Sequence, residues 1–174
     1  DSSTSRGLGD VYKRQEDLTV TFAQEFTRLL GRFAYCQDAG ELAHEVRALI
    51  AEKKWKEVYA VESDVRSLLS PDNGLSFSTL PLEQADVSIT TCEALVARTG
   101  SMVLSARTGG RTTSVYAPVH ICIARTSQLV FDVKDALLLL KSRYPEGLPS
   151  QVSFATGPSR TADIEKTLVV GVHG

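Results

Sequence analysis

Apolar residues in the first part of the chain recur at helical spacing and then give way to a short apolar run. From residue 18 to residue 30 they fall three and four positions apart, which predicts an amphipathic helix that ends at Gly31. A short strand over residues 33–35 is expected next. Asp38 can then cap a second helix, whose apolar face would contain Leu42, Val46, Leu49 and Ile50.

The rest of the chain continues this alternation of strands and helices. Further strands are expected at residues 55–61, 86–91, 101–106, 119–124 and 151–155. Helical segments are expected at residues 65–69, 93–97, 133–140 and 164–172, the last with Ile164, Leu168, Val169 and Val172 on one side. The apolar run at residues 119–124 is typical of a strand buried on both faces in a parallel sheet. These elements predict an α/β fold whose ligands bind beyond the carboxyl ends of the strands.

The amino-acid composition indicates a globular domain and argues against nucleic-acid-binding and membrane-anchored proteins. With 174 residues, 43% hydrophobic and 23% charged, the chain is expected to bury a core without disulfides or metals. The formal net charge of -2 argues against a nucleic-acid-binding surface, which usually carries clustered basic residues. No apolar run approaches the ~20 residues that span a bilayer, so no membrane anchor is expected.

The cysteines and histidines show no metal-binding pattern. Cys36, Cys92 and Cys122 are odd in number and far apart, so we expect core packing rather than a zinc or iron–sulfur site, and a reducing cytoplasm fits best. His120 lies inside an apolar strand and is expected to be a hydrogen-bonded structural residue. There is no G-x-G-x-x-G sequence and no P-loop, so no nucleotide cofactor is predicted.

Residues 1–15 differ from the rest of the chain in their sequence pattern. They carry no apolar periodicity and no initiating methionine, and they resemble a translated sequencing-adapter scar. We therefore expect a disordered, non-native leader at residues 1–15 and a single domain at residues 16–174.

The segment at residues 156–165 has the composition of an anion-binding loop. A Gly-Pro pair ends the preceding strand, and hydroxyls and an arginine follow where a helix is expected to begin. A helix start attracts anions, and an arginine adds a fork suited to a carboxylate or phosphate. The ligand-binding residues expected here are Gly157, Ser159, Arg160, Thr161 and Asp163. The alternative is a simple helix cap, with Arg160 paired to Asp163 or Glu165.

A second candidate passage covers residues 92–101. Glu93 could act as a base or nucleophile if its surroundings activated it, or it could cap or salt-bridge locally. Thr99 and Gly100, at the turn within residues 92–101, are also predicted to bind the ligand. A subset of the loop arginines could also converge on an organic acid or phosphate, or each could simply be solvated. These arginines are Arg98, Arg107, Arg111, Arg125 and Arg160.

Several long motifs, in order along the chain, resemble the LUD-domain family, and in particular its lactate utilization protein C members. The motifs lie at residues 89–101, 118–121, 127–130, 156–165 and 171–174. The resemblance covers about residues 17–174 and is strongest from residue 86. It implies a three-layer α/β/α domain with a mostly parallel sheet, similar to the ribose-phosphate isomerase, glucosamine-phosphate deaminase and CoA-transferase group.

The resemblance also implies a metabolic setting. Members of the family take part in bacterial oxidation of L-lactate to pyruvate beside iron–sulfur partner proteins, and they continue past Gly174 into a further strand, so we expect a C-terminally truncated domain. The resemblance transfers no catalytic residue. One hypothesis is an accessory or substrate-handling subunit without a redox cofactor of its own. The other is a stand-alone enzyme on a small organic acid, CoA ester or sugar phosphate, with Glu93 reacting and Arg160 as anion clamp.

Overall fold

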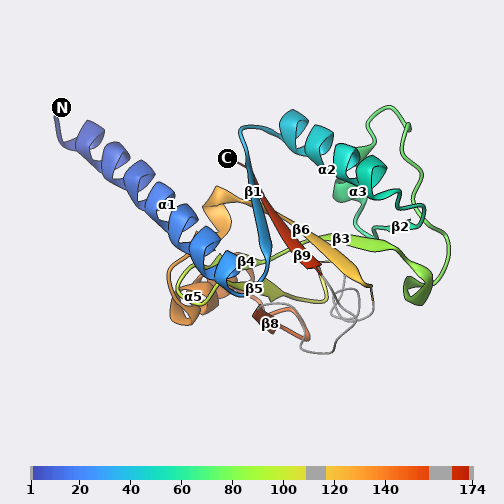
Figure 1. The fold of residues 1–174 in the computed structure, drawn as a ribbon. Coiled ribbons are helices and arrows are strands. Elements are labelled where there is room, and N and C mark those ends of the chain that lie inside the picture. Colours follow the sequence, from blue (N-terminus) through green and yellow to red (C-terminus); the bar gives the residue numbers. More distant parts are fainter. Residues whose placement is uncertain (1, 109–116, 157–165, 173–174) are drawn as a thin grey trace.

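The computed structural model describes residues 2–108, 117–156 and 166–172, together with the side chains of residue 14 and of residues 16–108 and 117–156. The strands in these ranges form two sheets (Figure 1). Sheet A has five strands, all parallel, in the order β1-β9-β6-β3-β2. Their bounds are β1 Arg32–Cys36, β9 Lys166–Val172, β6 Val119–Arg125, β3 Val87–Thr91 and β2 Val58–Tyr59.

Sheet B has four strands in the order β7-β4-β5-β8. β4 pairs antiparallel with β5 and parallel with β7, and β8 is antiparallel to β5. The bounds are β7 Leu129–Val130, β4 Ala94–Val96, β5 Ser101–Leu104 and β8 Ser153–Thr156. The sequence pattern predicted the strands at β5 and β8 but gave no sign that they belong to a separate sheet.

The helices pack on both faces of sheet A and on the outer side of sheet B. They are α1 Ser2–Arg28, α2 Ala39–Lys53, α3 Ser63–Leu69 and α5 Val133–Arg143, with short 3-10 turns η1 Leu82–Gln84 and η2 Thr126–Gln128. Apolar residues of α2 and α3 pack on one face, and those of α1 pack on the other together with sheet B. α5 packs against the outer side of sheet B. The result is the expected three-layer α/β arrangement with a mostly parallel central sheet.

Local sequence explains the elements that were predicted correctly. The carboxylate of Asp38 accepts a hydrogen bond from the Glu41 amide at 2.8 Å and so caps α2 as expected. Leu42, Val46 and Ile50 on the inner face of that helix are buried. In β6 the central residues are buried on both faces, because helices and sheet B cover both sides of sheet A.

Two helix predictions are wrong. Residues 166–172 form strand β9, which pairs in parallel with both β1 and β6, rather than the end of a final helix. Its β-branched residues Thr167, Val169, Val170 and Val172 favour an extended backbone, and a short apolar run fits either periodicity. The helical turn expected at residues 93–97 is strand β4 instead.

Helix α1 begins at Ser2, so it includes residues 2–15 of the expected leader, for which no regular structure was predicted. That these residues are non-native stays a prediction. In the part of the chain that the structure describes, no helix has the length and apolar character required to cross a membrane.

Candidate functional site

The candidate site is a cavity where two neighbouring strands of sheet A end. β3 ends at Thr91 and β6 ends at Arg125, and the two strands are in register with Thr91 opposite Ile123. The cavity beyond these ends has a volume of about 700 Å³. Residues of α3, of the two strand ends, of η2 and of α5 line it. They are Asp64, Val65, Ser67, Leu68, Thr91, Cys92, Ile123, Ala124, Arg125, Ser127, Gln128 and Arg143. The carboxyl edge of a parallel sheet is where open α/β folds bind ligands.

Side-chain hydrogen bonds fix the two strand ends relative to each other. The Gln128 side chain donates from Nε2 to the carbonyl oxygen of Cys92 at 2.6 Å and accepts at Oε1 from the Arg125 amide at 2.7 Å. Glu62, which precedes α3, accepts from the Thr91 amide at 2.8 Å and also from the Thr91 hydroxyl. The floor of the cavity is therefore tied to both the η2 turn and α3.

Glu93 lies just behind this cavity and is almost completely buried, with 2% of the residue exposed. Its carboxylate accepts hydrogen bonds from the Ser105 hydroxyl at 2.8 Å and from the Tyr144 hydroxyl at 2.9 Å. Arg143 Nη1 donates to Glu93 Oε2 at 2.6 Å and to the Glu93 carbonyl oxygen at 3.0 Å. The buried charge is thus paired and hydrogen-bonded, which is the condition for keeping a carboxylate away from water.

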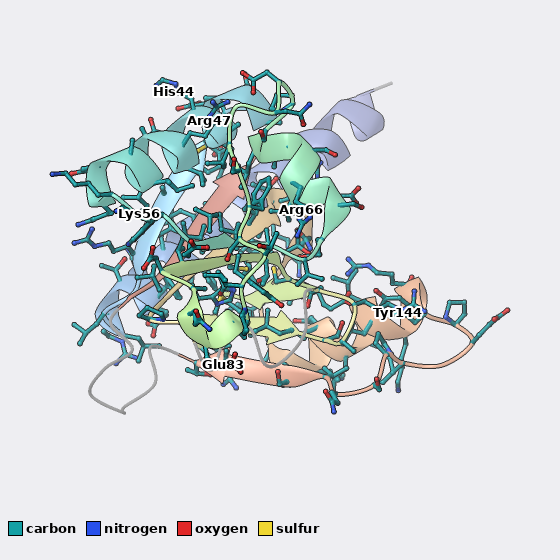
Figure 2. The ribbon with its side chains drawn as sticks, turned by 90° about the vertical axis from the view of Figure 1, so that its right-hand side faces the viewer. His44, Arg47, Lys56, Arg66, Glu83 and Tyr144 are labelled. Atoms are coloured by element: carbon teal, nitrogen blue, oxygen red, sulfur yellow. The ribbon has the colours of Figure 1, made fainter. Side chains whose placement is uncertain are left out.

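Arg143 connects the buried carboxylate to the cavity. Its side chain is 34% exposed, and it lines the cavity while it bonds to Glu93. Helix α5 places it there, because Arg143 is the last residue of a helix that Asp132 caps through a 2.7 Å hydrogen bond to the Val133 amide. A cation in the last turn also interacts favourably with the helix dipole. In Figure 2, α3 with Arg66 lies above the end of α5 with Tyr144.

Tyr144 is held from two sides. Its hydroxyl donates to Glu93, and the guanidinium of Arg107 lies 5.1 Å from the centre of its ring. Burial raises the pKa of Tyr144, and the hydrogen bond to the Glu93 carboxylate raises it further. The phenol therefore stays protonated and acts as a donor to Glu93 at neutral pH.

The structure separates residues that the sequence analysis had grouped. Glu93 precedes β4, at the end of the β4–β5 hairpin where Ala94 pairs with Val103. Thr99 and Gly100 lie at the opposite end, beyond the pair Val96 and Ser101. They do not join Glu93 in one site.

The Thr99–Gly100 turn has a structural role of its own. The hydroxyls of Thr99 and Ser101 lie 2.7 Å apart, and that of Ser101 lies 2.6 Å from Thr156 Oγ1. Gly100 has a φ of 65°, and a Cβ on it would lie 2.9 Å from the amide nitrogen of Phe26 in α1.

The other predicted ligand-binding residues lie outside the described residues, so their role stays a prediction. They are Gly157, Ser159, Arg160, Thr161 and Asp163. The helix expected to supply positive polarity there is replaced, over residues 166–172, by β9.

The loop arginines have different partners. Arg98 pairs with Asp132 at 3.1 Å, and Arg107 covers Tyr144. Arg125 lines the cavity, and among the described residues no carboxylate forms an ion pair with it. Arg111 and Arg160 lie outside the described residues. Arg143 was missed, because a basic residue in the last turn of a helix gives no sign that it reaches a cavity.

The expected structural residues are confirmed. His120 is buried, with its Nε2 atom 2.7 Å from Thr90 Oγ1, and burial lowers the pKa of His120 to about 4. Cys36, Cys92 and Cys122 are buried free thiols. A hydrogen bond with Cys92, together with burial, raises the pKa of the Cys122 thiol. Among the residues that the structure describes, no group of three or more His, Cys, Asp and Glu side chains could hold a metal ion.

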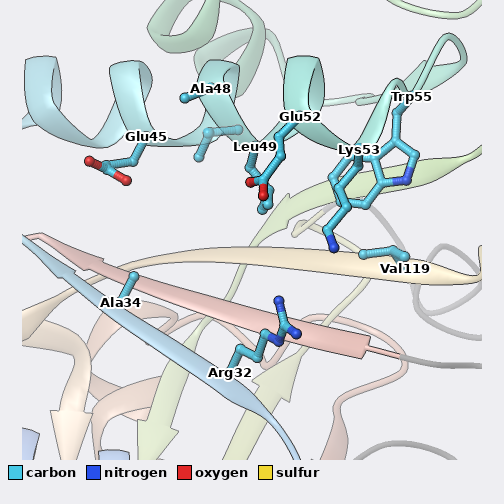
Figure 3. A pocket seen from close by; sticks show the side chains of 10 residues that line it. Arg32, Ala34, Glu45, Ala48, Leu49, Glu52, Lys53, Trp55 and Val119 are labelled. Carbon is cyan, nitrogen blue, oxygen red and sulfur yellow. The ribbon is translucent and has the colours of Figure 1, made fainter.

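A smaller groove of about 240 Å³ lies between α2 and sheet A (Figure 3). Arg32 and Val119, which begin β1 and β6, mark its position at the amino ends of these strands. Arg32 extends from the sheet toward α2, whose Glu45 and Glu52 extend toward the sheet (Figure 3). The groove is therefore remote from the strand ends where ligands of this fold class bind.

The LUD domain family model matches residues 80–174. A protein from Exiguobacterium sp. called Lactate utilization protein C is 31% identical over 98% of this chain and 80% of its own length. The chain belongs to the LUD-domain family. Another Lactate utilization protein C, from Bacillus licheniformis, is 39% identical over 95 residues, which are 53% of this chain and 40% of that protein. One from Halalkalibacterium halodurans is 43% identical over the same number of residues. The chain thus spans about 40% of the length of these curated relatives.

A solved structure agrees with the fold. The crystal structure of a DUF162 family protein from Deinococcus radiodurans superimposes with a TM-score of 0.71, covering 91% of this chain and 98% of that one at 19% identity. At this identity the likeness shows the fold alone. In this LUD-domain protein, the range that the family model matches contains β3, β6, Glu93, Arg125 and Arg143, and with them most of the residues that line the cavity.

Proposed function

We propose that this protein takes part in lactate utilization as an accessory or substrate-handling subunit of a cytoplasmic system that oxidises L-lactate to pyruvate. The observation that carries the proposal is the 31% identity to the Exiguobacterium Lactate utilization protein C along almost the entire chain. In this role the protein works with iron–sulfur partner proteins, which carry the electrons. Its own contribution is to bind the partners or the small acid.

The geometry supports substrate handling better than catalysis by Glu93. The Glu93 carboxylate accepts hydrogen bonds from Ser105, Arg143 and Tyr144, and the residue is 2% exposed. A nucleophile or general base needs an approach path for the reacting atom, within hydrogen-bond reach of its oxygens. The stand-alone enzyme that uses Glu93 is therefore the weaker of the two hypotheses.

Genetic complementation tests the role. In a bacterium whose own gene for Lactate utilization protein C is deleted, this chain should restore growth on L-lactate, while growth on glucose is the same with or without it. A second copy that carries the Arg98→Gln substitution, away from the cavity, should restore growth equally well. If the deletion strain does not grow on L-lactate and this chain fails to restore growth, the proposed role is contradicted.

Co-purification tests the partnership. The tagged protein should bring down partner chains that contain iron and acid-labile sulfide, which are measured chemically in the purified fraction. An untagged strain provides the background. If the protein purifies without iron under conditions in which lactate oxidation in the extract is intact, the iron–sulfur partnership is wrong.

A further inference from the structure

We propose that the cavity at the carboxyl ends of β3 and β6 is a binding site for a short 2-hydroxy or 2-oxo monocarboxylate, whose carboxylate is held by Arg125 and Arg143. The choice of this ligand class rests on the proposed function. The site itself rests on the positions of the two arginines, neither of which belongs to the loops at residues 99–100 and 157–163.

The charged residues of the cavity wall are Arg125, Arg143 and Asp64. The charge of Arg143 is balanced by Glu93 behind the wall. Arg125 is the cation without a carboxylate partner among the described residues, so it gains most from an incoming anion.

Glu93 orients the Arg143 side chain at the cavity wall. Glu93 engages only Nη1 of the guanidinium, through the bonds to Oε2 and to its carbonyl oxygen. The guanidinium carries five N–H donors in a rigid fork, so other donors remain for a ligand on the cavity side. Because Ser105 and Tyr144 hold the Glu93 carboxylate in place, Arg143 is oriented before a ligand arrives, and less side-chain entropy is lost on binding.

Polar side chains beside the arginines fit the rest of the ligand. Thr91, Ser127 and Gln128 line the same cavity. The Ser127 hydroxyl and the second amide proton of Gln128 can donate to a hydroxyl or keto oxygen next to the carboxylate, and the Thr91 hydroxyl, whose proton goes to Glu62, can accept from a ligand hydroxyl. Leu68 and Ile123 provide apolar surface for a methyl group. A few polar groups converging in a partly apolar cavity are typical of a small-molecule site.

The experiment is a ¹H–¹⁵N NMR titration of the purified protein with lactate, pyruvate, propionate and inorganic phosphate. Lactate and pyruvate should shift the amide signals of Arg125, Ser127 and Gln128 in a saturable way, and they should bind more tightly than phosphate. Arg125→Gln, at an exposed position, should weaken their binding at least about tenfold. Arg143→Lys keeps a cation beside Glu93 but loses the fork, and it should also weaken binding.

The control variants are Arg98→Gln, next to the Thr99–Gly100 turn, and Arg28→Gln, at the exposed end of α1. Both should bind lactate and pyruvate as tightly as the wild type. Any one of four results would overturn the site. They are equal affinity in all four variants, loss of binding only in Arg98→Gln or Arg28→Gln, tighter binding of phosphate, and no saturable shift by any monocarboxylate. The titration does not depend on growth. A failure of the lactate role would therefore appear in the complementation experiment, and a failure of the site would appear in the titration.

Discussion

The Nη1 atom of Arg143 lies 2.6 Å from the Oε2 atom of Glu93, and the two side chains differ greatly in exposure, at 34% and 2%. The pair therefore spans the wall between the protein interior and the cavity. Its buried end is fixed by Ser105 and Tyr144, and its exposed end faces the carboxyl edge of sheet A.

Glu93→Gln should lower the free energy of unfolding by about 2 kcal/mol. Arg143 loses its ionic partner, and the NH2 group of the glutamine takes the place of a carboxylate oxygen that accepts hydrogen bonds. The partial exposure of Arg143 keeps the loss below that of a fully buried ion pair. Urea unfolding followed by circular dichroism measures it. Glu83→Gln, at an exposed position in η1, is the matched control. Equal stability of the two variants would show that the pair contributes nothing.

Tyr144→Phe should cost about 1 kcal/mol, since it removes one donor to Glu93 at 2.9 Å while the ring can remain beside Arg107. Thermal unfolding of both variants, with the half-exposed Tyr35→Phe as control, checks this value. In a cycle with Glu93→Gln the two losses should not add, because both residues belong to one hydrogen-bonded group. Strict additivity would contradict the coupling.

The buried His120 should make stability depend on pH. Its pKa is lowered to about 4 in the folded protein, against about 6.5 in an unfolded chain, so between these values only the unfolded state binds the proton. The contribution of His120 to stability is therefore complete above about pH 6.5 and falls by about 3 kcal/mol as the pH drops to about 4.

Denaturant titrations of the wild type and of His120→Gln at several pH values measure this dependence. The difference in unfolding free energy between the two proteins should shrink or change sign as the pH falls through that window. His44→Gln, at an exposed position of α2, is the control for removing a histidine. A difference that stays constant from pH 7 to pH 4 would mean that His120 titrates alike in both states.

Gly100→Ala should destabilise the protein by about 2–4 kcal/mol. The φ of 65° disfavours any side chain, and the new Cβ would lie 2.9 Å from the backbone nitrogen of Phe26, which belongs to α1 and cannot move alone. Gly40→Ala, inside α2, meets only the Asp38 side chain at 3.3 Å and should be neutral or stabilising. Comparable melting temperatures for the two variants would contradict a tight contact between the β4–β5 hairpin and α1.

Much of the fold could be predicted from local sequence. Asp38 and the apolar spacing that follows define α2, and the apolar run of β6 indicates a buried parallel strand, because these signals depend on neighbouring residues alone. The identity of β9 could not be predicted in this way. Residues 166–172 fit a helical spacing as well, and only the gap between β1 and β6 in sheet A decides for a strand.

The candidate site was predictable only in part. Arg125 stands at the end of an apolar strand, so its place at the carboxyl edge of the sheet follows from the sequence. Arg143 is 18 residues further along and reaches the same cavity only because α5 packs on sheet B, which no local pattern indicates. Glu93 was recognised as chemically notable, but its burial behind Arg143 depends on that same packing.

A crystal structure of the protein with lactate or pyruvate tests the central claim most directly. The claim predicts electron density for one ligand in the cavity beyond β3 and β6, with its carboxylate about 2.7–3.2 Å from guanidinium nitrogens of Arg125 or Arg143. Ligand density in the groove under α2 or beside Arg98, with no ligand at the two arginines, would contradict it.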